Sequence, residues 1–120
     1  MFKPGVTIWY SVKSLKDTIH FYKELLGFEL AFHDADSGMA MVNTTTKDCI
    51  IGFSEAEEVI PSTSSTVFEV YDIEASRRSL EQKGVTFIGE TETVPDMAKL
   101  ATFVDPDGHS LMLSEELSPL

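Results

Sequence analysis

Cysteine, positive charge and long apolar runs are all scarce in this sequence of 120 residues. The single cysteine, Cys49, excludes a disulfide within the chain and is typical of the reducing cytoplasm, where we expect the protein to reside. Nine basic against 20 acidic residues give a net charge of −11. This charge argues against nucleic acid and membrane partners, because both attract basic patches. No run approaches the roughly 20 apolar residues of a membrane span. Met1-Phe2-Lys3-Pro4 leads straight into the first expected strand without a secretory signal pattern, so we expect no such signal.

The stretch from Phe103 to Ser114 carries the clearest local signal. Its centre, Asp105-Pro106-Asp107-Gly108, is a tight-turn sequence, because proline presets φ and glycine accepts a positive φ. Short alternating apolar runs lie on both sides of the turn, which indicates a β-hairpin.

The same series of elements is predicted twice along the chain. The first series has strands at 6–12, 28–32, 39–43 and 48–53, with a helix that Ser14 caps and Gly27 ends. The second has strands at 66–70, 85–87, 99–104 and 109–114, a helix from Asp72 to Gly84, and a less regular segment around Pro95-Asp96. Val12-Lys13-Ser14-Leu15 recurs as Val70-Tyr71-Asp72-Ile73, which indicates duplication. We expect an α+β fold of two βαβββ modules (about 5–54 and 65–115), joined by a polar linker (55–64) in one domain, 1–120.

The helix end and the late turn together resemble a known superfamily. Phe21-Tyr22-Lys23-Glu24-Leu25-Leu26-Gly27-Phe28 and the Asp-Pro-Asp-Gly turn are similar to the vicinal oxygen chelate superfamily, which includes glyoxalase I, bleomycin-resistance proteins and extradiol dioxygenases. The resemblance implies a cleft lined by curved sheets of paired modules. It also implies a homodimer, with the modules paired within a chain or exchanged between chains.

In metal-dependent members each module supplies two ligands, and the resemblance places these positions at Thr7, Gly52, Ser65 and Met112. Hydroxyls, glycine and a thioether do not replace the imidazole and carboxylate groups that Zn²⁺, Fe²⁺ or Mn²⁺ prefer. We therefore expect no metal, no other cofactor and no catalytic residue. His33 and His109 remain candidates for an unconventional metal site, and Glu115 would reach the ligand position only after a register slip.

Strand alternation predicts which side chains line the cleft, because alternate residues of a strand share a face. The predicted ligand-binding residues are Thr7, Trp9, Ser11, Gly52, Ser65, Val67, Glu69, Ser110 and Met112. Trp9 suits a planar or amphipathic molecule and Glu69 suits a cationic one. Alternatively, Trp9 and Met112 belong to the ordinary core.

The first functional hypothesis is a metal-free small-molecule-binding protein, similar to the antibiotic-resistance members, that sequesters a cationic or aromatic drug-like ligand. The second is a glyoxalase-like lyase or a dioxygenase-type enzyme with a shifted or absent metal site. The third is an interaction module with a filled cleft. The sequence implies no Ser–His–acid triad and contains no glycine-rich phosphate loop, and it does not identify the ligand.

Overall fold

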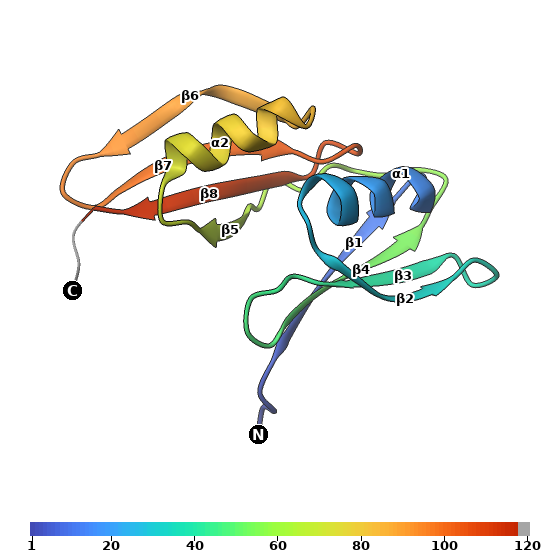
Figure 1. Cartoon of the computed structure of the whole chain (residues 1–120). Coiled ribbons are helices and arrows are strands. Elements are labelled where there is room, and N and C mark those ends of the chain that lie inside the picture. The colour runs from blue at the N-terminus through green and yellow to red at the C-terminus, as the bar shows by residue number, and fades with distance from the viewer. Residues whose placement is uncertain (118–120) are drawn as a thin grey trace. The chain divides into compact units, whose positions relative to one another are not determined.

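The computed structural model describes residues 1–117 and contains the βαβββ order twice (Figure 1). The chain divides between Ile60 and Pro61 into two compact units, here called unit 1 and unit 2. The end of the predicted domain, 118–120, lies outside the described residues. The α+β class and the paired-module architecture are confirmed.

Unit 1 is a four-stranded sheet with helical turns on one face. Its elements are β1 (Val6–Val12), α1 (Leu15–Ile19), the π-helical η1 (His20–Leu25), β2 (Glu29–Asp34), β3 (Met39–Asn43) and β4 (Cys49–Glu55). The strand order is β1-β4-β3-β2, with β1 parallel to β4 and the other pairs antiparallel. The first and last strands of the module therefore lie next to each other.

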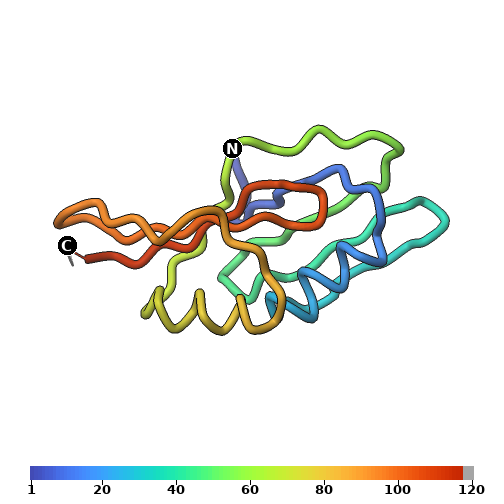
Figure 2. The backbone as a smooth tube through the Cα atoms, turned by 90° about the horizontal axis from the view of Figure 1, so that it is seen from above, coloured from blue at the N-terminus to red at the C-terminus, as the bar shows by residue number. Residues whose placement is uncertain are grey.

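Unit 2 repeats this topology with its own elements. They are β5 (Thr66–Glu69), α2 (Ile73–Gln82), β6 (Thr86–Val94), β7 (Ala98–Val104) and β8 (Ser110–Glu116), and the strand order is β5-β8-β7-β6. Strands β6 and β7 form a long hairpin (Figure 2). The segment expected to be less regular is mostly strand. Irregular backbone occurs at the bulge between Ile88 and Glu92, where Gly89 has a φ of 71°, and at the turn, where Asp96 has a φ of 61°.

The first helix begins as predicted but continues in a wider form. The Ser14 hydroxyl accepts a hydrogen bond from the Asp17 amide at 3.1 Å, which caps the helix. After one α-helical turn the chain widens to π-helix, and the Leu26 amide donates to the Phe21 carbonyl at 3.0 Å. The wider turn accommodates two adjacent aromatic side chains in the core, because Phe21 is 5% exposed and Tyr22 is fully buried.

Each unit has its own core between the sheet and its helix. In unit 1 the Tyr22 ring lies 4.7 Å from the Phe53 ring, and in unit 2 the Phe87 and Phe103 rings lie 5.2 Å apart (centroid distances). The buried strand residues are Tyr10, Val12, Ala40, Val42, Ile51, Phe53, Ala101, Phe103, Leu111 and Leu113. Because these alternate along their strands, the intervening residues face away from the helix. No helix among residues 1–117 has the length and apolar character needed to cross a lipid bilayer.

Candidate ligand-binding faces

The sheet face of unit 1 that lies opposite the helix carries an aromatic and apolar row, here called the unit 1 open face. The strand registers align Trp9 on β1 with Gly52 on β4, Met41 on β3 and Phe32 on β2. Trp9 is 47% exposed and Phe32 is 41% exposed. Thr7 and Ser11 are exposed on either side of Trp9 along the same strand, as alternation predicts.

The Trp9 ring lies across Gly52 and is held there by a hydrogen bond. Its indole Nε1–H donates to the Ser54 hydroxyl at 2.7 Å. A Cβ added at Gly52 would lie 2.2 Å from two carbons of the ring, closer than any real contact. Residue 52 must therefore be glycine for the ring to occupy this position. The ring covers Gly52 and leaves much of its own surface exposed for a ligand.

Charge is absent from the central part of the unit 1 open face. The open-face residues of β1, β4 and β3 are all uncharged: Thr7, Trp9, Ser11, Ile50, Gly52, Ser54, Met39, Met41 and Asn43. The first ionisable residues in these rows are Glu29 and Asp34 on the edge strand β2. The face therefore presents aromatic and thioether groups with hydroxyls, a composition that suits a planar, largely apolar molecule.

The corresponding face of unit 2, the unit 2 open face, is less aromatic. Its registers align Val67 on β5 with Met112 on β8, Thr102 on β7 and Ile88 on β6. Val67 is 50% exposed, whereas Met112 is half-buried. The hydroxyls of Ser65 and Ser110 lie 2.6 Å apart and bond to each other.

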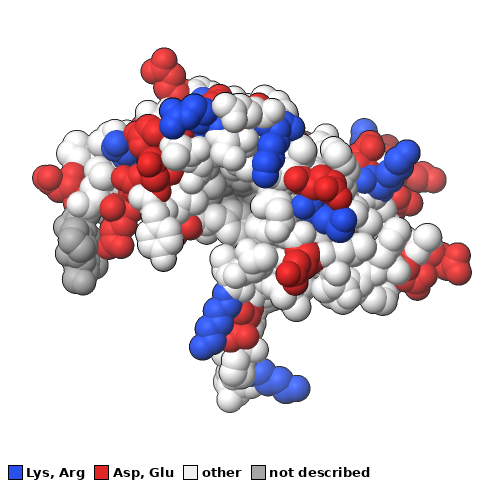
Figure 3. Space-filling model, in the orientation of Figure 1, with Lys and Arg blue, Asp and Glu red and all other residues white. Residues whose placement is uncertain are grey.

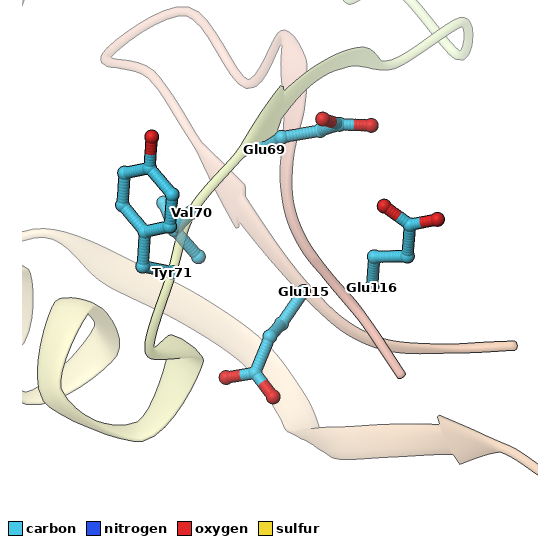
Figure 4. A pocket seen from close by; sticks show the side chains of 5 residues that line it. All are labelled: Glu69, Val70, Tyr71, Glu115 and Glu116. Atoms are coloured by element: carbon cyan, nitrogen blue, oxygen red, sulfur yellow. The ribbon is translucent and has the colours of Figure 1, made fainter. Parts of the chain in front are cut away.

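An open pocket of about 410 Å³ lies where β5 and β8 end in unit 2. Glu69, Val70, Tyr71, Glu115 and Glu116 line it (Figure 4). Figure 4 shows the Glu69 and Glu116 side chains extending into the same space, whereas the Glu115 side chain points away from them. Glu69, the carboxylate predicted to line the cleft, therefore has Glu116 as an acidic neighbour. Within residues 1–117 neither of these two glutamates forms a salt bridge.

The four superfamily metal positions do not fit a divalent cation. Gly52 lies opposite Trp9 just as Met112 lies opposite Val67, so the two positions are equivalent in their units. Gly52 offers no donor atom, and the Trp9 ring occupies the space into which a ligand side chain would extend. In unit 2 the available groups are the Ser65 hydroxyl and the Met112 thioether, which are not the donors that Zn²⁺, Fe²⁺ or Mn²⁺ prefer.

Glu115 has a different role from a displaced metal ligand. The register of β8 does not slip, and the Glu115 carboxylate accepts a hydrogen bond from the Ile73 amide at 2.8 Å, at the start of α2. Asp72, Glu74 and Glu115 have ligand oxygens within 4.8 Å of one another. Each is already engaged, since Asp72 caps the Ala75 amide at 3.1 Å and Glu74 pairs with Lys99 at 2.9 Å.

The two candidate histidines differ in surroundings and belong to different units. His33 is exposed on β2. His109 is 3% exposed, and its Nδ1 accepts a hydrogen bond from the Ser62 amide at 2.9 Å. Neither unit by itself brings these two side chains together, so they do not form a metal site within one unit.

Several open-face residues were not found from the sequence. Met41, Phe32, Thr102 and Ile88 complete the two rows. Phe32 and Ile88 lie on β2 and β6, which both contain a bulge that changes the alternation. The Met39-Ala40-Met41-Val42-Asn43 alternation was a usable signal for β3, because Ala40 and Val42 are buried and the other residues are not.

The charged groups on the face in view in Figure 3 are spread over both units, without a basic stripe. The ion pair between Lys99 and Glu74 joins β7 to α2. The hydrogen bond from Lys99 lowers the pKa of the Glu74 carboxyl, and the same bond raises the pKa of Lys99. Likewise Lys23 lowers the pKa of the adjacent Glu24. Each pair lies within one unit, on its helix side and not on its open face.

Comparison with known proteins agrees with the duplicated βαβββ topology. The family model described as the Glyoxalase/Bleomycin resistance protein/Dioxygenase superfamily matches residues 6–113. The chain therefore belongs to this superfamily. A search of the curated proteins finds no match to the chain.

Solved structures of the same fold span nearly the whole chain. An integron cassette protein from the mobile metagenome of the Halifax Harbour sewage outfall is 27% identical, with a TM-score of 0.80 over 95% of this chain and 99% of that one. An antibiotic binding protein from a Streptomyces species is 20% identical, with a TM-score of 0.80 over 96% and 97% of the two chains. A fosfomycin resistance protein from Listeria monocytogenes is 19% identical, with a TM-score of 0.79 over 96% and 94%.

Proposed function

We propose that this protein binds a small aromatic or amphipathic molecule on the unit 1 open face, without a metal ion, and acts by sequestering it. The observation that carries the proposal is the Trp9 ring, which lies on Gly52 at one of the superfamily's metal positions. Where metal-dependent members have a metal-coordinating side chain, this protein has an aromatic ring on which a planar molecule can stack. It therefore favours binding over metal-assisted catalysis at this place.

The position of the ring also supports a preorganised surface. The hydrogen bond to Ser54 and the contact with Gly52 fix the plane of the indole, so little side-chain freedom remains to be lost on binding. Stacking on such a ring contributes on the order of 0.5–1.5 kcal/mol beyond the burial of area. Met41 and Phe32 extend the apolar surface along the same row.

A positive charge on the ligand is the second part of the proposal. The net charge of −11 favours the approach of cations, and Glu69 with Glu116 places two carboxylates at one pocket of unit 2. The names of two relatives of the same fold, an antibiotic binding protein and a fosfomycin resistance protein, guide the choice of compounds to test. At their low identity they support the fold and not a particular ligand.

We further propose that the protein is a cytoplasmic homodimer. The duplicated βαβββ topology supports this proposal, because members of the superfamily commonly pair their modules across a two-fold axis, within a chain or between chains. The single cysteine agrees with a reducing compartment.

Fluorescence and calorimetry test the proposed ligand face. Trp9 is the single tryptophan, so its emission reports on one place. Antibiotics and small aromatic amines are titrated into the wild-type protein, and a true ligand shifts or quenches this emission in a saturable way. By calorimetry, Trp9→Ala weakens binding about tenfold or more, because burial and stacking are both lost.

The control is Phe2→Ala, which removes another exposed aromatic ring outside the two rows and leaves affinity unchanged. In the separate pocket of unit 2, Glu69→Gln weakens binding of a cationic compound, most strongly at low salt, where charges are less screened. If saturable binding occurs while the Trp9 emission stays constant and Trp9→Ala retains full affinity, the ligand binds elsewhere and the proposal is wrong.

A further inference from the structure

A short segment at the start of unit 2, Pro61–Ser65, is fastened to the turn between β7 and β8. The Ser62 amide donates to His109 Nδ1 at 2.9 Å, and the Ser110 amide donates to the Ser62 carbonyl at 3.3 Å. Pro61 lies close to Gly108, because a Cβ added at Gly108 would be 3.5 Å from the proline ring. Since unit 1 ends at Ile60, this segment is the connection as it enters unit 2.

One of these bonds depends on the protonation state of a histidine. A nitrogen that accepts a hydrogen bond carries no proton, so His109 is neutral here and has its ring proton on Nε2. A protonated imidazole has an N–H at both nitrogens. Protonation would therefore set the Nδ1–H of His109 against the N–H of Ser62. Of the two hydrogen bonds that hold the segment, this one would be lost, and only the bond from the Ser110 amide would remain.

Two carboxylates, those of Asp105 and Asp107, belong to the same turn as the His109 ring. Asp105 is 4% exposed, and its Oδ1 accepts from the amides of Asp107 and His109, each at 2.9 Å. The segment 61–65 contains no ionisable side chain.

We propose that His109 is a pH-sensitive fastening for the connection between the two units. The neutral ring holds Ser62 against the β7–β8 turn. Protonation in mild acid releases Pro61–Ser64, which lengthens the free connection while the Ser65–Ser110 hydroxyl pair still marks the start of β5. Histidine is suited to this role because its charge changes between about pH 5 and 8.

Amide hydrogen exchange of the peptides that contain Ser62 tests the proposal at about pH 7.5 and 5.5, the two sides of histidine titration. Rates are corrected for the intrinsic pH dependence of exchange. In the wild-type protein the protection of Ser62 falls about tenfold or more on acidification, as expected for a local opening, while β8 stays protected. If Ser62 protection does not change, or if β8 loses protection with it, the proposal is overturned.

Two variants separate the ring's titration from its shape. His109→Asn places a side-chain oxygen near the position of Nδ1, so it retains the acceptor without titrating, and Ser62 stays protected at both pH values. His109→Phe has no acceptor and leaves Ser62 unprotected at both. His33→Asn, at an exposed histidine, retains the wild-type response. If His109→Asn loses protection in acid like the wild type, another group is responsible.

Nuclear magnetic resonance of the wild-type protein gives an answer even where a variant fails to fold. The ring nitrogens of His109 show the Nε2–H tautomer at neutral pH, and the Ser62 amide signal shifts with the same midpoint as the ring titration. A neutral ring with the proton on Nδ1, or a Ser62 shift with a different midpoint, contradicts the proposal.

Discussion

Replacing Gly52 by alanine tests the arrangement on which the proposed site depends. Gly52 has no positive φ, so its backbone conformation is open to alanine. In the absence of a clash, Gly→Ala at such a position stabilises a protein by about 0.4–1 kcal/mol, because the unfolded chain loses freedom. The Trp9 ring reverses this expectation, since the new Cβ would lie 2.2 Å from two ring carbons.

The magnitude follows from what the ring must give up. Moving the indole off residue 52 breaks its 2.7 Å bond to Ser54, which contributes about 0.5–1.5 kcal/mol. Strain from an overfilled site typically costs about 1–3 kcal/mol. After subtracting the gain from alanine in the unfolded chain, we expect Gly52→Ala to lower the free energy of unfolding by about 1–3 kcal/mol.

Urea denaturation measures the loss of stability, and tryptophan emission measures the displacement of the indole ring. Gly52→Ala lowers the urea midpoint and moves the emission of the displaced indole toward that of exposed tryptophan. The same Gly52→Ala change in a Trp9→Ala background, followed by circular dichroism, is neutral or stabilising because the clash is gone. This change of sign is the decisive result. Equal destabilisation with and without Trp9 would refute the contact.

The remaining predictions concern the helix starts, pH, metal and assembly. Glu115→Ala removes the acceptor for the Ile73 amide, so urea denaturation should show a free energy of unfolding lower by about 1 kcal/mol, as for loss of a helix cap. Glu115→Gln keeps an acceptor oxygen and should retain most of this stability. The neighbouring Glu116→Ala is the control and should change the free energy of unfolding little. The lowered pKa of Glu74 means that its bond to Lys99 stabilises the fold above the ordinary glutamate range and is lost as pH falls through the lowered pKa. Thermal melts should show that Lys99→Gln removes this acid dependence and has little effect at neutral pH, because the pair is exposed. Elemental analysis after dialysis against chelator should give no stoichiometric Zn, Fe or Mn, and chelator should leave ligand affinity unchanged; retention of one metal per chain contradicts the metal-free proposal. Sedimentation should give twice the chain mass of 13.3 kDa, and a monomer mass would contradict the homodimer.

The sequence predicted the first and last strands of each module well. From Trp9 to Val12 in β1 and from Ser110 to Ser114 in β8, buried and accessible residues alternate, so a period of two placed Tyr10 and Leu111 inside and Trp9 and Met112 on the other face. The helix positions were also predicted correctly. Ser14 and Asp72 cap the two helix starts, and Gly27 and Gly84 follow the two helix ends.

Features that depend on contacts between distant residues were not predictable in this way. No local pattern shows that the ring of Trp9 crosses to Gly52, because their pairing depends on the parallel register of β1 and β4. The π-helical widening of the first helix was missed for a similar reason. It reflects the fit of Phe21 and Tyr22 against the sheet, and helix periodicity alone does not report this fit.

The glutamate at the end of each last strand has a consequence for how the chain folds. Glu55 accepts a hydrogen bond from the Leu15 amide at 2.9 Å, and Glu115 does the same for Ile73, so each helix start is completed by a residue some forty positions later in its own half. A nascent helix therefore lacks this partner until its last strand has docked. Completing each helix start requires the whole length of its half, and each half uses its own glutamate for this.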